Sequence, residues 1–483
     1  MLYLVLFEFN FYNLFMFTIQ DSEILQQASK QSLKLAKRSF GALNHYDPRI
    51  NRRVIQVAEK LYSSPATTFS KAFKTKAERK AAYRLISNDA LEPEELIDSI
   101  AKGSFDELES EKPELVIVAQ DTSVVSTKDF DDVGLVGKEC TSGFFFHSAI
   151  GISIEGIPLN LLGMKIYTRG KAKKSSREAW KHLPLEEKES YRWVEMVKEI
   201  VPRLPASTKP IFVSDRESDM HEYFQTLIDS NAYFVVRHSH NRRIKADSGQ
   251  ISNVREQLSN SKVQGITPLV IPKGHNRKER IARVNIQWEN ISFHIRSGGL
   301  AIHKGRKPLS LTALRIFEPD DKVQSPIEWI LYTNLSISCL DEALEVLRLY
   351  TCRWRIEEFH LTLKTGMKVE RNRFGSGTRI QRLLSIATPV AIKLLGMIYK
   401  SRHFPEESAE KSLSKTELEV AKAIIKQQTG RKPIKVNLGM LVKHVAFLGG
   451  WMGRKCDGPP GIRTFWEGWR QVQMIATTLH SMR

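Results

Sequence analysis

The stretch LVIVAQD, residues 115–121, decides how the middle of this chain folds. Its unbroken apolar run, closed by two polar residues, predicts a strand that is buried on both faces of a sheet. The stretch PIFVSD, residues 210–215, has the same form and also ends on an aspartate. Between them, two strand-like segments and then a helical one occupy residues 142–154, 158–168 and 191–204. This order of elements predicts an α/β domain built on one sheet.

Regions of different character flank and interrupt this α/β domain. Residues 21–100 read as short basic helices and predict a DNA-binding domain with Arg49, Arg53 and Arg84 among its contacts, although the same charges also suit ordinary solvated helix faces. Residues 240–325 predict a β-rich insertion. The expected division is therefore an apolar extension, a helical DNA-binding domain, a catalytic domain and a helical C-terminal region, at residues 1–20, 21–100, 101–375 and 376–483.

One segment of the insertion has a clear alternating pattern. Apolar residues alternate with polar ones on both sides of the Glu289-Asn290 pair, with Val284 and Ile286 before it and Ile291 after it. Alternation around a short polar pair is typical of a β-hairpin. We therefore expect a turn at Glu289-Asn290.

The first twenty residues, MLYLVLFEFNFYNLFMFTIQ, are unusually apolar and aromatic. They lack the basic start and the small-residue cleavage site of a signal peptide, and Glu8, Asn10 and Asn13 interrupt the apolar run. The run is also short for a membrane span. We expect a dispensable extension without a membrane role, and Met16 is an alternative start.

The overall charge points to a polyanionic partner. The chain has 73 Lys and Arg residues against 54 Asp and Glu, giving a formal net charge of +19 and a pI near 9.6. Such a chain attracts nucleic acid through the phosphate backbone. Charge alone does not separate a nuclease from a ribosome-associated or membrane-surface protein. The four cysteines are scattered without zinc-ligand spacing, which indicates a reduced, cytosolic chain.

The segment 341–366 predicts one long helix with two different faces. Four polar residues fall within a sector of about 60° at 100° per residue, and they are Tyr350, Arg353, Glu357 and Lys364. The apolar residues that fall on the other side are Leu349, Ile356, Phe359 and Leu363. This pattern predicts a buried face and a polar stripe. A solvated face of mixed charge is the alternative on spacing alone.

Three carboxylates on elements with buried faces form a candidate catalytic set. Asp121 and Asp215 each follow a buried strand, where open α/β sheets place their sites, although turn residues and helix N-caps are commoner fates for such aspartates. Glu357 would complete the set from the helix. Two divalent ions about 4 Å apart can stabilise both the attacking and the leaving oxygen of a phosphodiester.

The ligand types in this set favour magnesium, with manganese as a substitute, because hard oxygen ligands suit these ions. Asp121 would bridge the two ions, while Asp215 and Glu357 would hold one each. Arg353 can fork onto a phosphate, and Tyr350 and Lys364 can add single contacts.

The same residues carry a resemblance to a known family. The pattern Y-x2-R-x3-E-x6-K, here YTCRWRIEEFHLTLK at 350–364, resembles the signature of the insertion-sequence-four family of DDE transposases, the group that includes the transposase of transposon five. VIVAQDTS and VSDRESDMHEY resemble the motifs of its first and second aspartates. Further matching segments occur in order from about residue 22 to the C-terminus, and they are FGALNHYDPR, AAYRLISN, GFFFHS, FVVRH, LGGWM and FWEGW.

The resemblance implies an RNase H-like catalytic domain with a β insertion, a helical N-terminal DNA-binding domain and a helical C-terminal dimerisation region. Such enzymes nick DNA at the ends of an element, form and open hairpins, and join the 3′ ends to target DNA. They bind terminal repeats and target DNA as a homodimer, in the cytoplasm and at the nucleoid of bacterial-type cells.

Two residues acquire a role from the resemblance alone. Trp329 stands where such enzymes place an aromatic residue that stacks on a flipped base, and stacking can offset the cost of unstacking. A core tryptophan on a strand is the alternative. Arg237 in FVVRH matches a phosphate contact near the same place.

Two other functions remain open at this point. An RNase H-like nuclease that cleaves without strand transfer would share the carboxylates but would have little need of Trp329 or the polar stripe. A domesticated DNA-binding regulator would need none of them.

Overall fold

The computed structural model describes residues 22–63, 68–137, 140–169, 182–246, 249, 251–271, 280–294, 306–319, 326–366, 369–371, 374–454 and 457–481. The extension predicted at residues 1–20 lies outside the described residues. The helices are α1 (Ser22–Phe40), α2 (Pro48–Ser63), α3 (Lys76–Ile86), α4 (Pro93–Glu111), α6 (Tyr191–Ile200), α7 (His221–Asp229), α8 (Val254–Asn260), α9 (Leu340–Thr351), α10 (Trp354–Leu361), α11 (Gly377–His403), α12 (Lys415–Thr429), α13 (Leu438–Leu448) and α14 (Ile462–Ser481).

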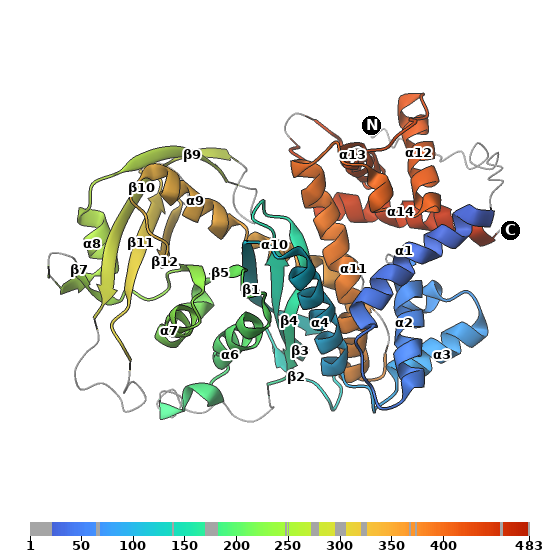
Figure 1. Cartoon of the computed structure of the whole chain (residues 1–483), viewed down its shortest axis with the longest axis horizontal. Helices are drawn as coiled ribbons and strands as arrows, with labels where there is room; N and C mark the ends of the chain where they lie inside the picture. Colours follow the sequence, from blue (N-terminus) through green and yellow to red (C-terminus); the bar gives the residue numbers. More distant parts are fainter. Residues whose placement is uncertain are drawn as a thin grey trace, which may run out of the picture.

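The strands form one mixed sheet at the centre of the molecule (Figure 1). They are β1 (Leu115–Ser126), β2 (Gly134–Val136), β3 (Thr141–Ile152), β4 (Pro158–Tyr167), β5 (Lys209–Ser214), β6 (Tyr233–Arg237), β7 (Arg243–Ala246), β8 (Ile251–Asn253), β9 (Gly265–Ile271), β10 (Arg280–Phe293), β11 (Ser310–Phe317) and β12 (Glu328–Thr333). The order along the sheet is β2-β3-β1-β5-β6-β12-β11-β10-β7-β8, with β4 paired to β3 and β9 paired to β10. The strands β1, β3 and β4 pair antiparallel, whereas β1, β5 and β6 run parallel.

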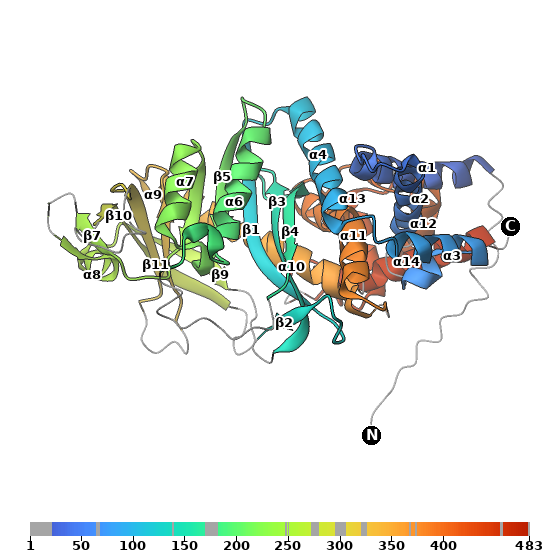
Figure 2. The ribbon, with the colours of Figure 1, turned by 90° about the horizontal axis from the view of Figure 1, so that it is seen from below.

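Helices cover both faces of this sheet, as the apolar run of β1 predicts. Ile117 and Ala119 belong to the hydrophobic core that also contains α10 and α11, whereas Val116 and Val118 belong to the core that contains α6 and α7. Successive side chains of a strand point to opposite faces. A strand that is apolar at every position therefore lies between two helical layers, and Figure 2 shows α6 and α7 beside the strands in a second view.

The β-rich segment extends the central sheet instead of forming a separate one. β12 pairs antiparallel with β6, and β11 and β10 follow outward from it. The hairpin expected at Glu289-Asn290 is wrong, because β10 runs through both residues and pairs with β11 on each side of them. Val284 and Ile286 face one core, while Ile291 faces the other. One strand between two cores thus produces the alternation that we interpreted as two strands.

The N-terminal and C-terminal helices lie together at one end of the molecule (Figure 1). α1 packs against α2, α4 and α12, and α11 packs against α4 and β4. The domain boundary expected at residue 100 falls inside α4, which continues to Glu111. α4 is shared by both regions, because its apolar residues pack into both cores and one of them, Phe105, contacts the α6 layer. α4 therefore joins the N-terminal helices to the sheet.

One described helix, α11, is long and apolar enough to cross a membrane by length and composition. Within the protein, 83% of its most apolar window is buried. Helices α2, α10, α13 and α14 and strand β4 pack around it. Its apolar character is therefore explained by its position as a core helix.

Candidate active site

Asp121 and Asp215 lie side by side at the point where two parallel strands separate. The last paired residues of β1 and β5 are Ala119 and Val213, and each aspartate follows its paired residue by two positions. Neighbouring strands are about 4.8 Å apart, and residues two positions apart share a face. The register therefore brings the two carboxylates together, as the two similar sequence runs predicted.

Asp215 directly follows strand β5, as expected, whereas Asp121 does not lie at the end of its strand. Asp121 lies inside β1, which continues to Ser126 in antiparallel pairing with β3. The β-branched residues that follow Asp121 favour this continuation. Asp215 is the N-cap of the short 3₁₀ helix Arg216–Ser218, and its Oδ1 accepts a hydrogen bond of 2.9 Å from the Glu217 backbone. The capping bond fixes the orientation of the Asp215 carboxylate.

Glu357 comes from a helix that is less regular than the sequence predicted. The expected continuous helix 341–366 is divided into α9, α10 and a π-helical turn at Thr362–Gly366. Between α9 and α10, the backbone stays helical, but its hydrogen bonds tighten to the i→i−3 type, as from the Arg353 N–H to the Tyr350 carbonyl at 3.0 Å. The tightened turn and the wide π turn each change the angle between successive side chains. The prediction that Tyr350, Arg353, Glu357 and Lys364 lie within one 60° stripe is therefore wrong.

The members of the predicted stripe occupy different environments. Tyr350 is 5% exposed and belongs to the core, whereas Arg353 and Glu357 pair with each other and Lys364 is half-buried in the π-helical turn. The opposite face holds as predicted, because its four apolar residues are all buried, and they are Leu349, Ile356, Phe359 and Leu363.

Arg353 lies between two of the three carboxylates. Its Nη2 is 2.6 Å from the Glu357 Oε1, and its Nη1 is 3.8 Å from the Asp121 Oδ2. The Arg353 guanidinium is largely buried, so these ion pairs are only weakly screened by solvent. The two contacts link α10 to β1 and bring Glu357 to the same place as Asp121.

The carboxylates concentrate negative charge that the protein does not fully neutralise. Burial is the main cause that raises the pKa of Asp121 to about 7, and the charges of Asp215 and, less strongly, Glu357 contribute to the same rise. Arg353 and a 2.7 Å hydrogen bond from the Thr122 backbone oppose this rise. A raised pKa in a group of neighbouring carboxylates shows that their negative charges repel one another. A divalent cation bound among them would stabilise this arrangement.

The arrangement suits ions shared between pairs of carboxylates. In the part of the chain that the structure describes, no three His, Cys, Asp or Glu side chains converge closely enough to hold one ion by themselves. A two-ion site does not require such convergence, because each ion is held by two protein carboxylates and by substrate oxygens. The all-oxygen donor set of Asp121, Asp215 and Glu357 fits magnesium or manganese.

Trp329, Tyr350 and Arg237 form a cluster next to Arg353. The rings of Trp329 and Tyr350 meet edge to face at 5.9 Å, and the Arg237 guanidinium lies 5.8 Å from the Trp329 ring. The Arg353 guanidinium is 5.9 Å from the Tyr350 ring. Trp329 is only partly buried, and the buried Nε of Arg237 has no hydrogen-bond partner in the described part of the protein. The cluster therefore offers an aromatic ring and an unused donor beside the carboxylates.

A polar network that was not predicted from the sequence connects the two aspartates. Arg192 on α6 is buried; its Nε donates to the Thr122 hydroxyl at 3.0 Å, and its Nη2 pairs with Glu217. Thr122 follows Asp121, and the Glu217 backbone N–H donates a hydrogen bond to the Asp215 carboxylate. Arg192 therefore contacts residues next to both aspartates and links the two segments that carry them. The one available sequence signal was an arginine amid the apolar residues of that helix.

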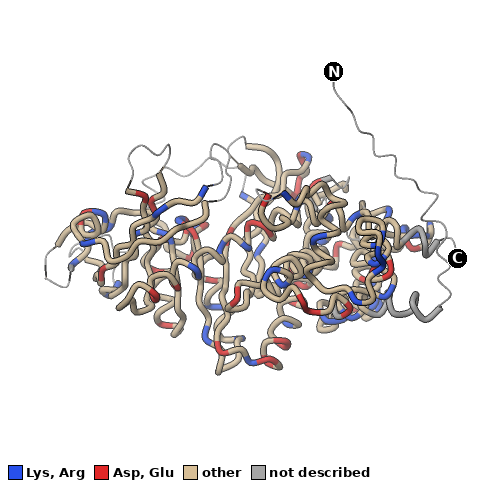
Figure 3. The backbone as a smooth tube through the Cα atoms, turned by 90° about the horizontal axis from the view of Figure 1, so that it is seen from above, with Lys and Arg blue, Asp and Glu red and all other residues tan. Residues whose placement is uncertain are grey.

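The basic residues predicted at the N-terminus are not part of this site. Arg49 and Arg53 lie on α2 and Arg84 on α3, all exposed, in helices that Figure 1 shows at one end of the molecule. The Arg49 guanidinium is bound by Asp47, with Nη2 to Oδ2 at 2.9 Å. Basic residues lie along the whole length of the molecule, so charge alone does not locate a DNA path (Figure 3).

Comparison with known proteins accounts for this combination of a carboxylate site and basic helices. Residues 33–91 match the family model described as "Transposase DNA-binding", and residues 186–389 match "Transposase DDE domain". Residues 390–483 match "Transposase Tn5 dimerisation domain". The chain is a DDE transposase. A DDE transposase cleaves DNA and transfers strands with divalent metal, so this chain has DNA as its partner and carries a dimerisation domain.

One solved structure resembles the transposase over most of its length. It is the cryo-EM structure of a piggyBac transposase synaptic complex with hairpin DNA, with a TM-score of 0.38 and 9% sequence identity, covering 91% of this chain and 85% of that chain. A likeness of this size supports no conclusion about mechanism, which must come from the residues of this chain.

Proposed function

We propose that this transposase belongs to the insertion-sequence-four family and moves an element by cut and paste. It nicks each terminal repeat, forms and opens a DNA hairpin, and joins the 3′ ends to target DNA. The catalytic residues are Asp121, Asp215 and Glu357, within an RNase H-like domain. Support for that domain type comes from three antiparallel strands followed by two parallel ones, in the sheet order β4-β3-β1-β5-β6.

The observation that carries the hairpin proposal is the cluster of Trp329, Tyr350 and Arg237 beside Arg353. A hairpin bends the DNA backbone sharply, so that a base leaves the stack and needs another surface to stack on. A partly exposed indole supplies such a surface, worth about 1–3 kcal/mol per base. A nuclease that only nicks straight duplex needs no such surface.

The arginines would hold the phosphates around this base. The buried Arg237 Nε has no partner in the described protein, and a phosphate oxygen would satisfy it. Arg353 can fork onto the scissile phosphate when it leaves Glu357. Lys364 would add a contact from the π-helical turn.

Two magnesium ions, for which manganese would substitute, would supply charge stabilisation for the attacking and leaving oxygens. Asp121 would bridge them, and Asp215 and Glu357 would each bind one. The Arg353 guanidinium reduces the repulsion between Asp121 and Glu357 before metal binds. Two copies of the chain, joined through the C-terminal region, would hold two element ends together at the nucleoid.

Substituting Trp329 tests the proposal. With DNA that carries the element's own terminal repeats, Trp329→Ala should reduce hairpin formation by about 10- to 100-fold, in line with the loss of one base stack. First-strand nicking should change less than threefold, as scored on denaturing gels. Trp288→Ala is the matched control, because Trp288 is also partly buried in the same sheet, on β10.

Equal loss of nicking and hairpin formation in Trp329→Ala would contradict the stacking role and favour a core tryptophan. Nicking by the unchanged transposase without hairpins or joined products would instead favour a nuclease that lacks strand transfer.

A further inference from the structure

A buried hydrogen bond joins the helix that carries Glu357 to the strand beside Asp121. The Ser148 hydroxyl on β3 and the His360 Nε2 on α10 are 2.7 Å apart, and both residues are buried. The contact spans 212 residues of sequence. It is not part of the metal set or of the aromatic cluster.

Strand register places Ser148 directly next to the catalytic centre. Ser148 is the pairing partner of Asp121 across β1 and β3. Side chains of directly paired residues point to the same face of a sheet. Ser148 and Asp121 therefore face α10 together.

His360 has a fixed position relative to Glu357 on the same helix. The two residues are three positions apart in α10, which makes them neighbours along the helix surface. Any shift or rotation of α10 that moves His360 relative to Ser148 also moves Glu357 relative to Asp121. A hydrogen bond restricts both the distance and the angle between its two groups, whereas apolar packing is non-directional and lets a helix shift along a sheet.

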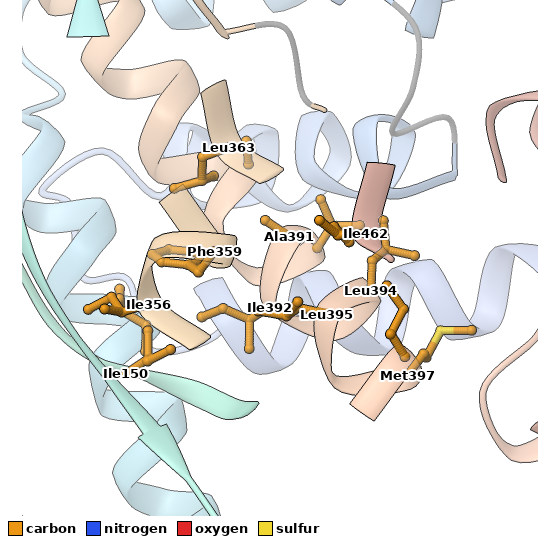
Figure 4. Packing of buried hydrophobic residues seen from close by; sticks show 14 of the residues in the cluster. Ile150, Ile356, Phe359, Leu363, Ala391, Ile392, Leu394, Leu395, Met397 and Ile462 are labelled. Atoms are coloured by element: carbon orange, nitrogen blue, oxygen red, sulfur yellow. The ribbon is translucent and has the colours of Figure 1, made fainter. Parts of the chain in front are cut away.

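Apolar packing around this hydrogen bond does not by itself define the position of α10. Ile356 and Phe359 pack between Ile150 of β3 and the residues of α11, as Figure 4 shows. The His360 ring meets Phe146 edge to face at 4.9 Å. Burial lowers the pKa of His360 to about 3, so the imidazole is neutral and the bond is an uncharged one. The Ser148–His360 pair is a directional contact between the buried faces of β3 and α10.

We infer that Ser148 and His360 are positioning residues that set the separation of Glu357 from Asp121, and thereby the affinity of the catalytic centre for its divalent ions. This inference rests on the proposed function, because it takes the three carboxylates as the metal ligands. Outer contacts that orient metal ligands typically change metal affinity by about 10- to 100-fold. A bond that served stability alone would not change the metal requirement.

The test is a magnesium titration of terminal-repeat nicking. Ser148→Ala removes one hydroxyl and should raise the magnesium concentration for half-maximal nicking by about tenfold. Manganese should restore part of the activity. Binding of terminal-repeat DNA in EDTA should stay within about twofold of the unchanged protein, because no DNA contact is altered. Ser148→Thr, which keeps the hydroxyl, should retain the original metal requirement.

Ser385→Ala is the matched control. Ser385 is fully buried on α11, and its hydroxyl donates to the Gln381 carbonyl of its own helix at 3.0 Å. The Ser385→Ala variant therefore also loses a buried hydroxyl, but the hydrogen bond it loses lies within α11 and does not involve α10. In a double-mutant cycle, Ser148→Ala combined with His360→Ala should be no worse than His360→Ala alone.

A wild-type magnesium requirement in Ser148→Ala would overturn this inference, as would an equal shift in Ser385→Ala. Additive effects in the double-mutant cycle would also overturn it. Absence of metal-dependent cleavage by the unchanged transposase would contradict the proposed function instead.

Discussion

The proposed catalytic centre and the N-terminal helices of this transposase differ in how their charged side chains are held. At the centre, Arg353 and Arg192 are buried, and they pair with Glu357 and Glu217 respectively. On α2 and α3, arginines such as Arg53 and Arg84 are exposed. The centre therefore has charges fixed in place, and the helices present charges that move freely in solvent.

This difference predicts two kinds of response to substitution. Charges that are fixed at low dielectric interact strongly and depend on exact position, so that one change removes most of the function. Exposed charges act through their sum and are screened by salt, so that each change has a modest effect.

The carboxylates should show the largest effects. Asp121→Asn, Asp215→Asn and Glu357→Gln should each reduce nicking and strand transfer by about 10³-fold, because each weakens a ligand of the divalent ions that would stabilise the transition state. Binding of terminal-repeat DNA should be retained in a gel-shift assay. Glu358→Gln is the control, because the neighbouring Glu358 instead accepts a hydrogen bond from Tyr399 at 2.5 Å. A similar loss of activity in Glu358→Gln would contradict the specific catalytic role of Glu357.

The same charges should destabilise the metal-free protein. Because the folded pKa of Asp121 is about 7, above its ordinary value of 3.8, its contribution to stability is complete below pH 4 and is lost as pH rises through 7. At pH 8 without divalent metal, Asp121→Asn should therefore raise the Tm by about 2–5 °C. The gain should shrink toward pH 5, and magnesium should stabilise the unchanged protein more than the variant. A lower Tm for Asp121→Asn at pH 8 would contradict this account.

The exposed arginines should give smaller, salt-dependent effects. Arg53→Ala or Arg84→Ala should weaken binding to terminal-repeat DNA by about three- to tenfold near 0.1 M salt, and each should reduce the slope of log affinity against log salt by about one. Arg49→Ala should have the smallest effect, because Arg49 must break its ion pair with Asp47 before it can bind a phosphate. Binding at several salt concentrations measures both quantities. Loss of nicking without loss of binding in Arg53→Ala would break the contrast between the two regions.

Much of the geometry of the proposed catalytic centre could be predicted from sequence, because its determinants are local. The apolar runs before Asp121 and Asp215 predicted two strands that are buried on both faces, and parallel pairing then brought their ends together. The apolar spacing around Glu357 predicted which helix face is buried. Each of these features depends on a few consecutive residues with a known repeat.

The features that sequence did not predict depend on distant contacts. The tightened turn at Arg353 contains neither glycine nor proline, and it accompanies packing of Tyr350 against Trp329. The continuous path of β10 through Glu289-Asn290 depends on pairing with β11. The hydrogen bonds of Arg192 and His360 join segments dozens to hundreds of residues apart, and no local pattern reports them.

The most direct test of the central claim is to locate the bound metal on the chain. Ferrous iron can replace magnesium at oxygen sites, and with peroxide it generates hydroxyl radicals that cut the nearby backbone. We expect cuts next to Asp121, Asp215 and Glu357 in the same protein, competed by excess magnesium and lost in Asp121→Asn. Cuts confined to one of these positions, or unchanged in Asp121→Asn, would contradict a shared metal centre formed by the three carboxylates.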